Sequence, residues 1–382
     1  MILFTSFVRN SAQKTNFLLT FLGGCVIINI VNDVWRTSLM PNSISLTNKT
    51  LSNRAATLAD GVLPYKKGNK MVDYARINNT LGKMGYYLSN HKSIVVSVSG
   101  GSDSDVIVHI ICTHFREYLP KVHFVFANTG LEYKATLRHL DYLEERYGIK
   151  INRVRGMSIP SAVKKYGVPF VSKKVSDYLG RLQKHKFTWV DGNIDYLNSQ
   201  FGKCRVALRW WCNDWGEKSR FNIDWNKGLK DYLINNPPKT KISAICCTKS
   251  KKEPLIKFQK SVEADLSISG ERKSEGGARV SKSSCFGHDH GIDRYMPLFY
   301  WNNETKDYYI KSEGIVRSDC YEIWGMKRTG CVGCPFGKDI VQELKLMKHY
   351  EPNMYKACMN VFGESYRMID TYGIREEKIF DI

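Results

Sequence analysis

Two common nucleotide-binding signatures are absent from this sequence of 382 residues. No glycine-lysine pair is followed by serine or threonine, which excludes the Walker A loop. No G-x-G-x-x-G segment occurs, which excludes the dinucleotide fingerprint. Internal repeats and low-complexity tracts are also absent, and this excludes a repeat architecture. The length is sufficient to bury a large core, in one domain with insertions or in two smaller domains.

The sequence also lacks an apolar run of the length that a membrane-spanning helix needs. The best candidate, Phe17–Val31, is short and is interrupted by glycines and by Asn29. Because Arg9 and Lys14 precede it, the apolar region of a secretory signal is an alternative. We expect a buried or unstructured extension, followed over residues 32–70 by a linker rich in serine, threonine, asparagine and lysine.

Acidic residues are few relative to basic ones. The 37 aspartates and glutamates stand against 57 lysines and arginines, which gives a formal net charge of +20. The basic residues are spread over the chain instead of forming a tail. This balance favours a polyanionic partner such as nucleic acid, or anionic small substrates, and a solvated basic surface is the plain alternative.

A short glycine turn between an apolar strand and a helix is the most informative feature that is present. The apolar run 93–98 precedes it and a second run, 106–111, follows it. Backbone N–H groups and the helix dipole at such a turn favour a phosphate or pyrophosphate. Asp103 occupies a position typical of a helix N-cap or of a carboxylate that organises Mg²⁺. The turn consists of Ser99, Gly100, Gly101, Ser102, Asp103 and Ser104.

Strands and helices alternate around this turn, which predicts an α/β fold with a doubly wound parallel sheet. Ligands of such sheets bind at the carboxyl ends of strands, where both Ser99–Ser104 and Asn128–Glu132 lie. Hydrophobic periodicity indicates the elements themselves. The predicted helices cover residues 73–90, 103–118 and 133–147, and the predicted strands cover residues 93–98, 122–127 and 151–154.

Residues 161–240 lose this alternation and are rich in lysine, arginine, tryptophan and tyrosine. Arg181–Lys186 and Arg209–Trp211 interleave basic and aromatic side chains, an arrangement that can hold phosphates and stack on bases. A helical insertion whose tryptophans belong to the core fits the pattern equally well. We therefore expect a basic, tryptophan-rich helical insertion with one of these two roles.

The segment Gly270–Arg279 is a candidate anion site. Arg272 and Arg279 are seven residues apart, so on a helix they share a face, and Glu275 between them can pair with both. Two guanidinium groups held by one carboxylate form a clamp for phosphate or sulfate. A surface ion-pair cluster is the alternative, but Gly276-Gly277 argues against a simple helix.

Eleven cysteines are arranged as metal ligands rather than as disulfide partners, which indicates a reducing compartment. Four thiolates suit either Zn²⁺ or a [4Fe–4S] cluster. Adjacent cysteines point in different directions, which the edge of a cubane cluster accepts more easily than a tetrahedral zinc site. The candidate ligands are Cys331 and Cys334 of a C-x-x-C pair, then Cys247, then Cys246 or Cys320, with Cys212 as an outside candidate.

Five segments, in this order along the chain, resemble motifs of the PAPS (phosphoadenosine phosphosulfate) reductase-like family. Ser99–Ser104 resembles the S-G-G-x-D-S PP-loop of the N-type ATP pyrophosphatases, the superfamily that includes this family. Asn128–Glu132 resembles D-T-G-x-E, with asparagine in place of the aspartate. Cys246–Leu255 is similar to C-C-x-x-x-K-x-x-P-L, and Gly270–Arg279 to G-x-R-x-x-E-S-x-x-R. Pro297–Pro335 is similar to the ending P-L…W…Y-I…C…R-x-G-C-x-x-C-P.

The resemblance implies an adenine nucleotide alpha hydrolase-like fold that binds ATP, or PAPS or APS, together with Mg²⁺. It also points to a [4Fe–4S] cluster, with Zn²⁺ as the alternative. The implied catalytic residues are Asp103, Arg272 and Arg279. The implied nucleotide site consists of Ser99, Gly100, Gly101, Ser102, Asp103, Ser104, Thr129, Gly130, Arg272, Glu275 and Arg279.

Five parts follow for the chain, which we expect to be cytoplasmic and free of membrane contact. They are an N-terminal extension and linker (1–70), a PP-loop nucleotide-binding core (71–160), the basic insertion (161–240), a substrate and cluster region rich in cysteine and arginine (241–345), and a helical tail (346–382).

Three functions fit these features, and we expect the first. An ATP-pyrophosphatase-type enzyme would adenylate a substrate, release pyrophosphate, and pass sulfur from a donor to tRNA or DNA. A PAPS or APS reductase would use a thioredoxin-like reductant, but that family attacks sulfur with a cysteine in a C-terminal tail, and no cysteine follows Cys358 here. A non-catalytic nucleic-acid-binding module would have no need of the intact Ser99–Ser104 turn.

Overall fold

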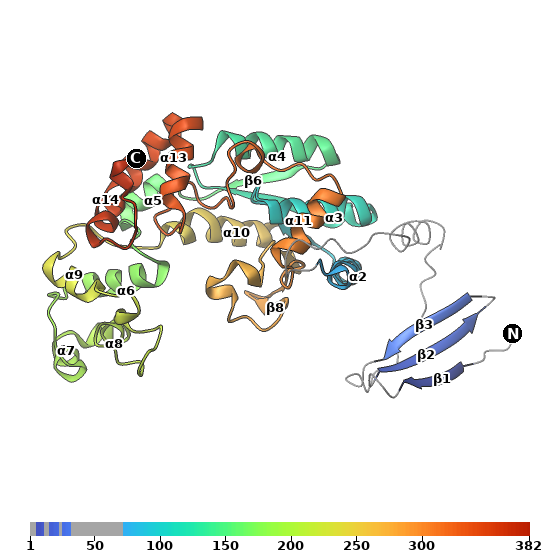
Figure 1. The fold of residues 1–382 in the computed structure, drawn as a ribbon, viewed down its shortest axis with the longest axis horizontal. Coiled ribbons are helices and arrows are strands. Elements are labelled where there is room, and N and C mark those ends of the chain that lie inside the picture. The colour runs from blue at the N-terminus through green and yellow to red at the C-terminus, as the bar shows by residue number, and fades with distance from the viewer. Residues whose placement is uncertain (1–4, 11–14, 23–24, 32–71) are drawn as a thin grey trace. The chain divides into compact units, whose positions relative to one another are not determined.

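The chain forms two compact units, Met1–Leu63 and Pro64–Ile382 (Figure 1). The computed structural model describes residues 5–10, 15–22, 25–31 and 72–382. In the first unit an antiparallel sheet has the strand order β1-β2-β3. Its strands are β1 (Thr5–Asn10), β2 (Thr15–Leu22) and β3 (Cys25–Val31).

The segment Phe17–Val31, for which we expected a buried or unstructured extension, contains most of β2 and all of β3. These strands pair in antiparallel register, with Phe17 opposite Ile30. β-branched and aromatic residues favour strands, which accounts for the difference. The predicted linker over residues 32–70 lies outside the described residues.

The second unit is built on a six-stranded sheet in the order β6-β5-β4-β7-β9-β8. All neighbouring strands are parallel except β8 and β9. The strand order reverses between β4 and β7, and ligands of open α/β sheets bind at such a reversal, beyond the carboxyl ends of the strands. The strands are β4 (Ile94–Ser97), β5 (Val122–Asn128), β6 (Ile151–Arg155), β7 (Leu266–Ile268), β8 (Phe286–Asp289) and β9 (Ile292–Tyr295).

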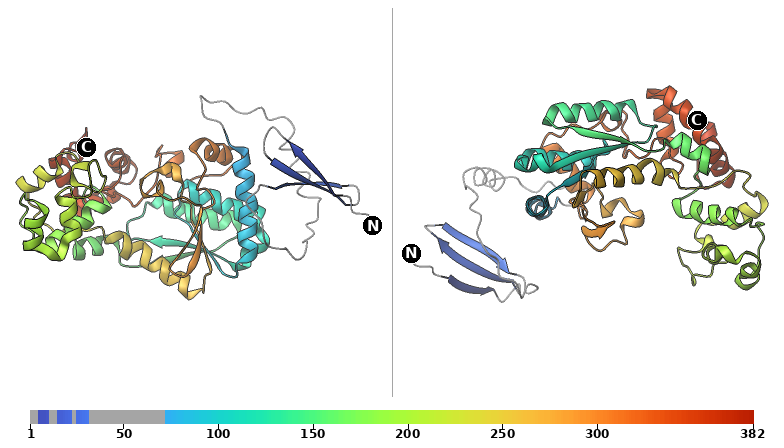
Figure 2. Two further views of the ribbon diagram at one scale, coloured as in Figure 1. Left: turned by 90° about the horizontal axis from the view of Figure 1, so that it is seen from below. Right: turned by 180° about the vertical axis from the view of Figure 1, so that it is seen from behind.

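Helices cover both faces of this sheet, as the doubly wound prediction requires; α4 and α10 lie on opposite sides of it in Figures 1 and 2. No helix in the described residues is both long enough and apolar enough to cross a membrane. The helices of this unit include α2 (Tyr74–Asn90), α3 (Ser102–His114), α4 (Lys134–Tyr147), α5 (Ile159–Tyr166), α6 (Lys173–Lys184), α7 (Ile194–Phe201), α8 (Arg205–Trp211), α9 (Leu229–Asn235), α10 (Glu253–Ser261), α11 (Asn303–Ser312), α12 (Asp319–Glu322), α13 (Ile340–Tyr350) and α14 (Pro352–Tyr372).

Local sequence explains the elements around the glycine turn. Ile94, Val95 and Val96 of β4 are fully buried, as expected of a central parallel strand that is covered on both faces. The side chain of Asp73 caps the N-terminus of α2, and Gly148 ends α4 in the left-handed conformation. The helices and strands predicted around the turn are therefore confirmed, apart from shifts of a few residues at their ends.

The predicted helical insertion is present as α5 to α9, and its adjacent tryptophans belong to a core. Trp210 and Trp211 are 1% and 0% exposed. They pack in a hydrophobic cluster with residues of α13 and α14, separate from the cluster around the sheet. Trp210 and Trp211 are therefore packing residues. They cannot stack on bases, because no face of either ring is accessible.

We predict that Gly100→Ala destabilises the protein more than Gly148→Ala, although both glycines have a left-handed φ, +67° and +64°. A Cβ at Gly100 would lie 2.7 Å from Thr136 Cγ2, whereas one at Gly148 would meet nothing within 4 Å. The left-handed conformation costs alanine about 1 kcal/mol, and the clash adds about 1–3 kcal/mol. Urea unfolding followed by circular dichroism would measure both losses.

Thr136→Ser is the matched control, because it removes the methyl group that the new Cβ would strike. In the Gly100→Ala background it should restore part of the free energy of unfolding. Equal losses for Gly100→Ala and Gly148→Ala would contradict the steric explanation.

Candidate active site

The glycine turn enters α3 at Gly101, which is the N-cap of the helix without a side-chain cap. The Ser104 hydroxyl donates a hydrogen bond to the Gly101 carbonyl oxygen (2.7 Å) and accepts one from the Ser99 N–H (3.2 Å). Asp103, for which we considered the N-cap position, lies instead in the first turn of α3. Backbone amides and the positive end of a helix dipole meet here, an arrangement that attracts anions.

Two basic side chains from distant segments converge on this loop. Arg272 Nε lies 2.8 Å from Asp103 Oδ1, and Lys306 Nζ lies 3.6 Å from the same oxygen. Lys306 also donates a hydrogen bond to Ser102 Oγ at 3.0 Å. Arg272 and Lys306 are only 4% and 8% exposed, so solvent screens their charges weakly. Two cations therefore flank the start of α3.

The clamp expected from Arg272, Glu275 and Arg279 is arranged differently. Two 3₁₀ turns, Lys273–Glu275 and Gly277–Arg279, replace a helix, and Gly276 between them has a φ of +75°. Glu275 Oε2 lies 3.2 Å from Arg279 Nε. It meets only the backbone N–H of Arg272, because the Arg272 guanidinium turns toward Asp103. One carboxylate therefore does not hold both guanidinium groups.

The predicted Thr129-Gly130 pair forms a turn after β5. The Thr129 hydroxyl is buried and donates to Glu132 Oε1 at 2.7 Å, and the Thr129 N–H donates to the same oxygen at 2.9 Å. A Cβ at Gly130 would lie 2.8 Å from Ser158 Cβ. Thr129 and Gly130 therefore shape this turn, and Glu132, which they position, is the residue of the segment that faces the neighbouring cavity.

Four of the predicted metal ligands come together. The Cys247 thiol hydrogen-bonds with the thiols of Cys246 and Cys331, and Cys334 lies beside Cys247 and Cys331. Cys320 is buried elsewhere, near Ser318 and Thr136. Of the two alternatives for the fourth ligand, Cys246 lies with this group and Cys320 does not. Cys212 is also remote from it, against the Gly192 carbonyl oxygen.

These thiols lie among apolar side chains, with the ammonium groups of Lys251 and Lys173 near them. Burial raises the pKa of Cys334 to about 12. The hydrogen bond with Cys247, together with burial, raises the pKa of Cys331, and the Lys251 ammonium opposes this shift. Buried thiols with raised pKa values lose their protons when a metal cation supplies the missing positive charge. The donor set is therefore suited to a metal group.

The spacing of the four sulfur atoms bears on which metal group they suit. A tetrahedral zinc ion with bonds of about 2.3 Å would hold its sulfur ligands about 3.8 Å apart. Among the described residues, no three of these sulfurs lie within 4.8 Å of one another. A polynuclear cluster does not require this spacing, because its ligands bind different metal atoms.

The C-terminal helices hold the C-x-x-C loop. Glu343 Oε1 on α13 accepts hydrogen bonds from the Gly333 N–H (3.0 Å) and from the Tyr133 hydroxyl (2.6 Å). The Tyr366 hydroxyl on α14 donates to the Gly333 carbonyl oxygen. Gly333 has a φ of +61°, and a Cβ there would lie 2.6 Å from Cys358 Sγ. Side chains of α13 and α14 therefore pack against the C-x-x-C loop. Cys358 is one of these packing residues.

A cavity of about 110 Å³ lies between the glycine turn and the cysteine group. Lys251 lies in the wall of this cavity. Burial lowers the pKa of Lys251, but Cys331 and Glu132 together raise it by more than burial lowers it. The net shift of the pKa is upward, so the ammonium is retained. A larger cavity of about 350 Å³ lies beside α2 and contains none of the predicted site residues. The lining of the smaller cavity includes Ser99, Glu132, Tyr133, Thr136, Lys251, Thr329, Gly330 and Val332.

Three of the residues around the loop were not singled out from the sequence. Lys306 lies on α11. Tyr321 and Thr329 lie beside Gly101: if this glycine carried a Cβ, their hydroxyl oxygens would be 3.2 Å and 3.1 Å from it. Thr329 is part of the segment that precedes the C-x-x-C pair, a signal that could have found it. No pattern in the sequence signals Lys306, since only folding brings α11 to the start of α3.

Several solved structures are similar to this chain at low identity. A phosphoadenylyl-sulfate (PAPS) reductase from Candida auris, in a phosphate complex, is 13% identical with a TM-score of 0.37, and the match covers 76% of this chain and 98% of that one. An NH3-dependent NAD synthetase from Campylobacter jejuni is 11% identical, with a TM-score of 0.32 and coverages of 80% and 97%. The U34-tRNA thiolase NcsA from Methanococcus maripaludis, with its [4Fe-4S] cluster, is 14% identical, with a TM-score of 0.29 and coverages of 79% and 80%.

A relative and a family are also found by sequence. An uncharacterized protein of Methanocaldococcus jannaschii is 26% identical over 277 residues, which are 72% of this chain and 42% of that protein, so this chain spans less than half of its length. The phosphoadenosine phosphosulfate reductase domain matches residues 93–193 and 219–336, more than half of this chain. These segments include the glycine turn, Arg272 and the four grouped cysteines. The predicted membership is thereby confirmed, and the chain belongs to the phosphoadenosine phosphosulfate reductase domain family.

Proposed function

We propose that this protein binds an adenine nucleotide at the Ser99–Ser104 loop and adenylates a substrate for sulfur transfer to nucleic acid. The observation that carries the proposal is the cavity between that loop and the cysteine group. Ser99 lines one wall, and Gly330 and Val332, which flank Cys331, line another. A group held at the cysteines would therefore face a nucleotide held at the loop.

Binding of the nucleotide rests on charge. The amides at the start of α3 would bind phosphate oxygens, aided by the helix dipole. Lys306, which already contacts Ser102 Oγ, would reach the same oxygens. Asp103 holds both Lys306 and Arg272 in position. Because these groups are preformed and little exposed, they stabilise charge on the leaving pyrophosphate without reorganising.

The proposed reaction has two steps. An oxygen of the acceptor attacks the α-phosphorus of ATP, the bond from that phosphorus to the bridging oxygen of the β-phosphate breaks, and pyrophosphate leaves with the electron pair. A sulfur nucleophile then attacks the acceptor carbon that carries the adenylated oxygen. The bond between that carbon and the oxygen breaks, and AMP leaves with the oxygen. Lys251, whose ammonium is retained in the cavity wall, is positioned to attract an anionic sulfur species toward the nucleotide.

Two cofactors belong to this proposal. When bound by Cys246, Cys247, Cys331 and Cys334, a [4Fe–4S] cluster would supply a site that holds sulfur. Magnesium would supply further neutralisation of phosphate charge. Asp103, which we considered as an organiser of Mg²⁺, has Oδ1 engaged by Arg272 and Lys306, so we assign the ion to the phosphates of the nucleotide.

The acceptor class follows from charge. The chain carries a formal net charge of +20, and exposed Lys327 and Arg328 are separated from Cys331 of the C-x-x-C pair only by Thr329 and Gly330. Cations at the entrance of a site attract the phosphates of tRNA or DNA. A sulfonucleotide reductase would need far less of this charge, because its substrate is small.

We predict that anaerobically purified protein given Mg-ATP releases AMP and pyrophosphate, and that one nucleic acid, bulk tRNA or DNA, increases the release. Lys306→Met should reduce pyrophosphate release about 100-fold, the usual effect of losing one preorganised charge at a transition state. Lys311→Met is the control, because Lys311 is exposed on the same helix. Thermal unfolding of both variants would exclude a general loss of structure.

Absence of pyrophosphate under every condition would overturn the adenylation proposal. PAPS and APS would then be tested, with thioredoxin-dependent release of sulfite as the readout. Salt-sensitive binding of nucleic acid without binding of any nucleotide would instead support a non-catalytic module.

We predict that the same anaerobic protein contains about four iron atoms and four sulfides per chain, the content of one [4Fe–4S] cluster. Cys331→Ser should lose most of this iron and sulfide, because it removes one of the four proposed ligands. Cys320→Ser should keep them, since Cys320 lies beside Thr136 and Ser318. Zinc without acid-labile sulfide in the wild-type protein would contradict the cluster.

A further inference from the structure

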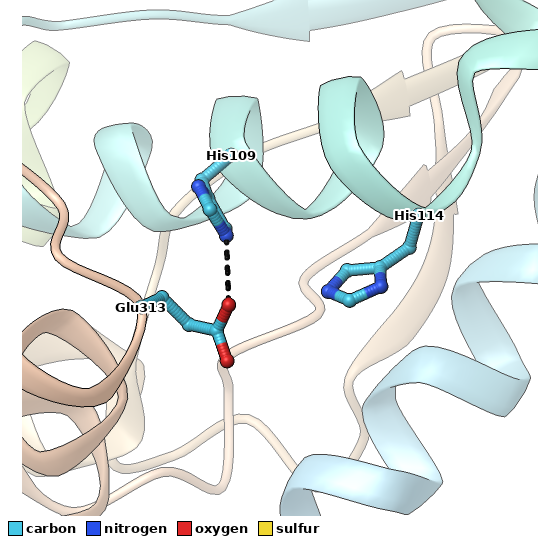
Figure 3. Close-up of side chains that lie close together, drawn as sticks. All are labelled: His109, His114 and Glu313. Carbon is cyan, nitrogen blue, oxygen red and sulfur yellow. Dashed lines mark ion pairs between the residues drawn. The ribbon is translucent and has the colours of Figure 1, made fainter. Parts of the chain in front are cut away.

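Three metal-ligating side chains meet on the half of α3 that is remote from the glycine turn (Figure 3). His109 and His114 lie on α3, and Glu313 follows the last residue of α11. One ligand atom from each of the three lies within 4.8 Å of the other two. Among the described residues, no other three histidine, cysteine, aspartate or glutamate side chains have this spacing. The site shares no residue with the loop or with the cysteine group.

The closest pair already has the separation that coordination requires. His109 Nε2 lies 3.4 Å from Glu313 Oε2. Metal–nitrogen and metal–oxygen bonds of about 2.0–2.2 Å with tetrahedral angles place two ligand atoms about 3.4 Å apart. Figure 3 shows the His114 ring beside this pair, and its ligand nitrogen lies within 4.8 Å of the other two ligand atoms.

The surroundings orient the ligands as they do in metal sites. The Tyr147 hydroxyl lies 3.0 Å from His109 Nδ1, which leaves Nε2 toward Glu313. That Nε2 is buried, and Glu313 Oε2, 3.4 Å away, is the polar atom that faces it. The Tyr309 hydroxyl lies 3.3 Å from His114 Nε2. The hydrogen bond to His109 Nδ1, the nitrogen that does not face Glu313, is of the kind that supports a metal-bound imidazole.

We propose that His109, His114 and Glu313 bind a divalent transition-metal ion, with Zn²⁺ as the best match. Two imidazoles and one carboxylate are borderline ligands that suit Zn²⁺ better than the hard cations Mg²⁺ and Ca²⁺. Three protein ligands leave a fourth position for water, and the Glu313 side chain, 35% exposed, opens the site to solvent. The proposal does not depend on the proposed function.

The ion would link α11 to α3. Lys306, three residues before Tyr309 on α11, contacts Ser102 at the start of α3. A metal bound at the far ends of the two helices would hold them in register and so keep Lys306 against the loop. We assign the site this positioning role, at a distance from the reacting groups.

The experiment measures zinc bound by the full chain after removal of metals and equilibrium dialysis against Zn²⁺. Any zinc taken up by the grouped cysteines is common to all variants, so the signal is the difference between variants. Wild-type protein should bind one more zinc per chain than His114→Gln and Glu313→Gln. His290→Gln is the matched control and should equal wild type, because His290 is exposed in the β8–β9 hairpin.

Two further readouts keep the result interpretable. Zinc should raise the thermal midpoint of wild type and His290→Gln more than that of Glu313→Gln, which alters only an exposed helix end. Tyr147→Phe should weaken zinc binding at this site about 10–100-fold, the usual effect of losing a hydrogen bond to a ligand. Equal zinc content in wild type and Glu313→Gln would overturn the site. Neither readout depends on pyrophosphate release, so failure here and failure of the proposed function are distinguishable.

Discussion

The buried ion pair between Asp103 and Arg272 joins the two halves of the sheet where the strand order reverses. Asp103 follows β4 and Arg272 follows β7, and both side chains are largely shielded from water. A buried charge that loses its partner costs about 3–5 kcal/mol, so each segment holds the other in place. Gly270 permits the approach, because a Cβ there would lie 3.2 Å from the Asp103 carbonyl carbon. The position of the glycine turn, and of Lys306 beside it, depends on this contact.

A second set of contacts brings the cysteine group to the same edge of the sheet. Glu343 accepts hydrogen bonds from Gly333 and from Tyr133, which directly precedes α4. It thereby connects the C-x-x-C loop to the sheet region and to α13. Arg375 adds hydrogen bonds to the carbonyl oxygens of Pro335 and Gly337. The two hydrophobic clusters of this unit therefore meet where the cavity lies, with the loop on one side and Cys331 on the other.

Local patterns were sufficient to predict the elements around the glycine turn. A run such as Ile94–Ser97 has few alternatives to a buried strand, because apolar residues on both faces must be covered. The predicted helix over 73–90 is α2, which begins one residue after its Asp73 cap. The four grouped cysteines were all among the predicted ligands. The sequence could not show whether Cys246 or Cys320 lies with the other three cysteines, since the separation of either residue from the C-x-x-C pair along the chain is compatible with such a group.

The sequence by itself determined the alternating α/β elements, the family motifs and their order, because each depends on residues close together in the chain. Tertiary structure alone decided that Arg272 pairs with Asp103 rather than with Glu275, that Lys306 reaches the loop, and that Trp210 and Trp211 are core residues. The free energy of burial determines which partner a charged or aromatic side chain contacts. That free energy is set by whichever distant segments the fold packs against it.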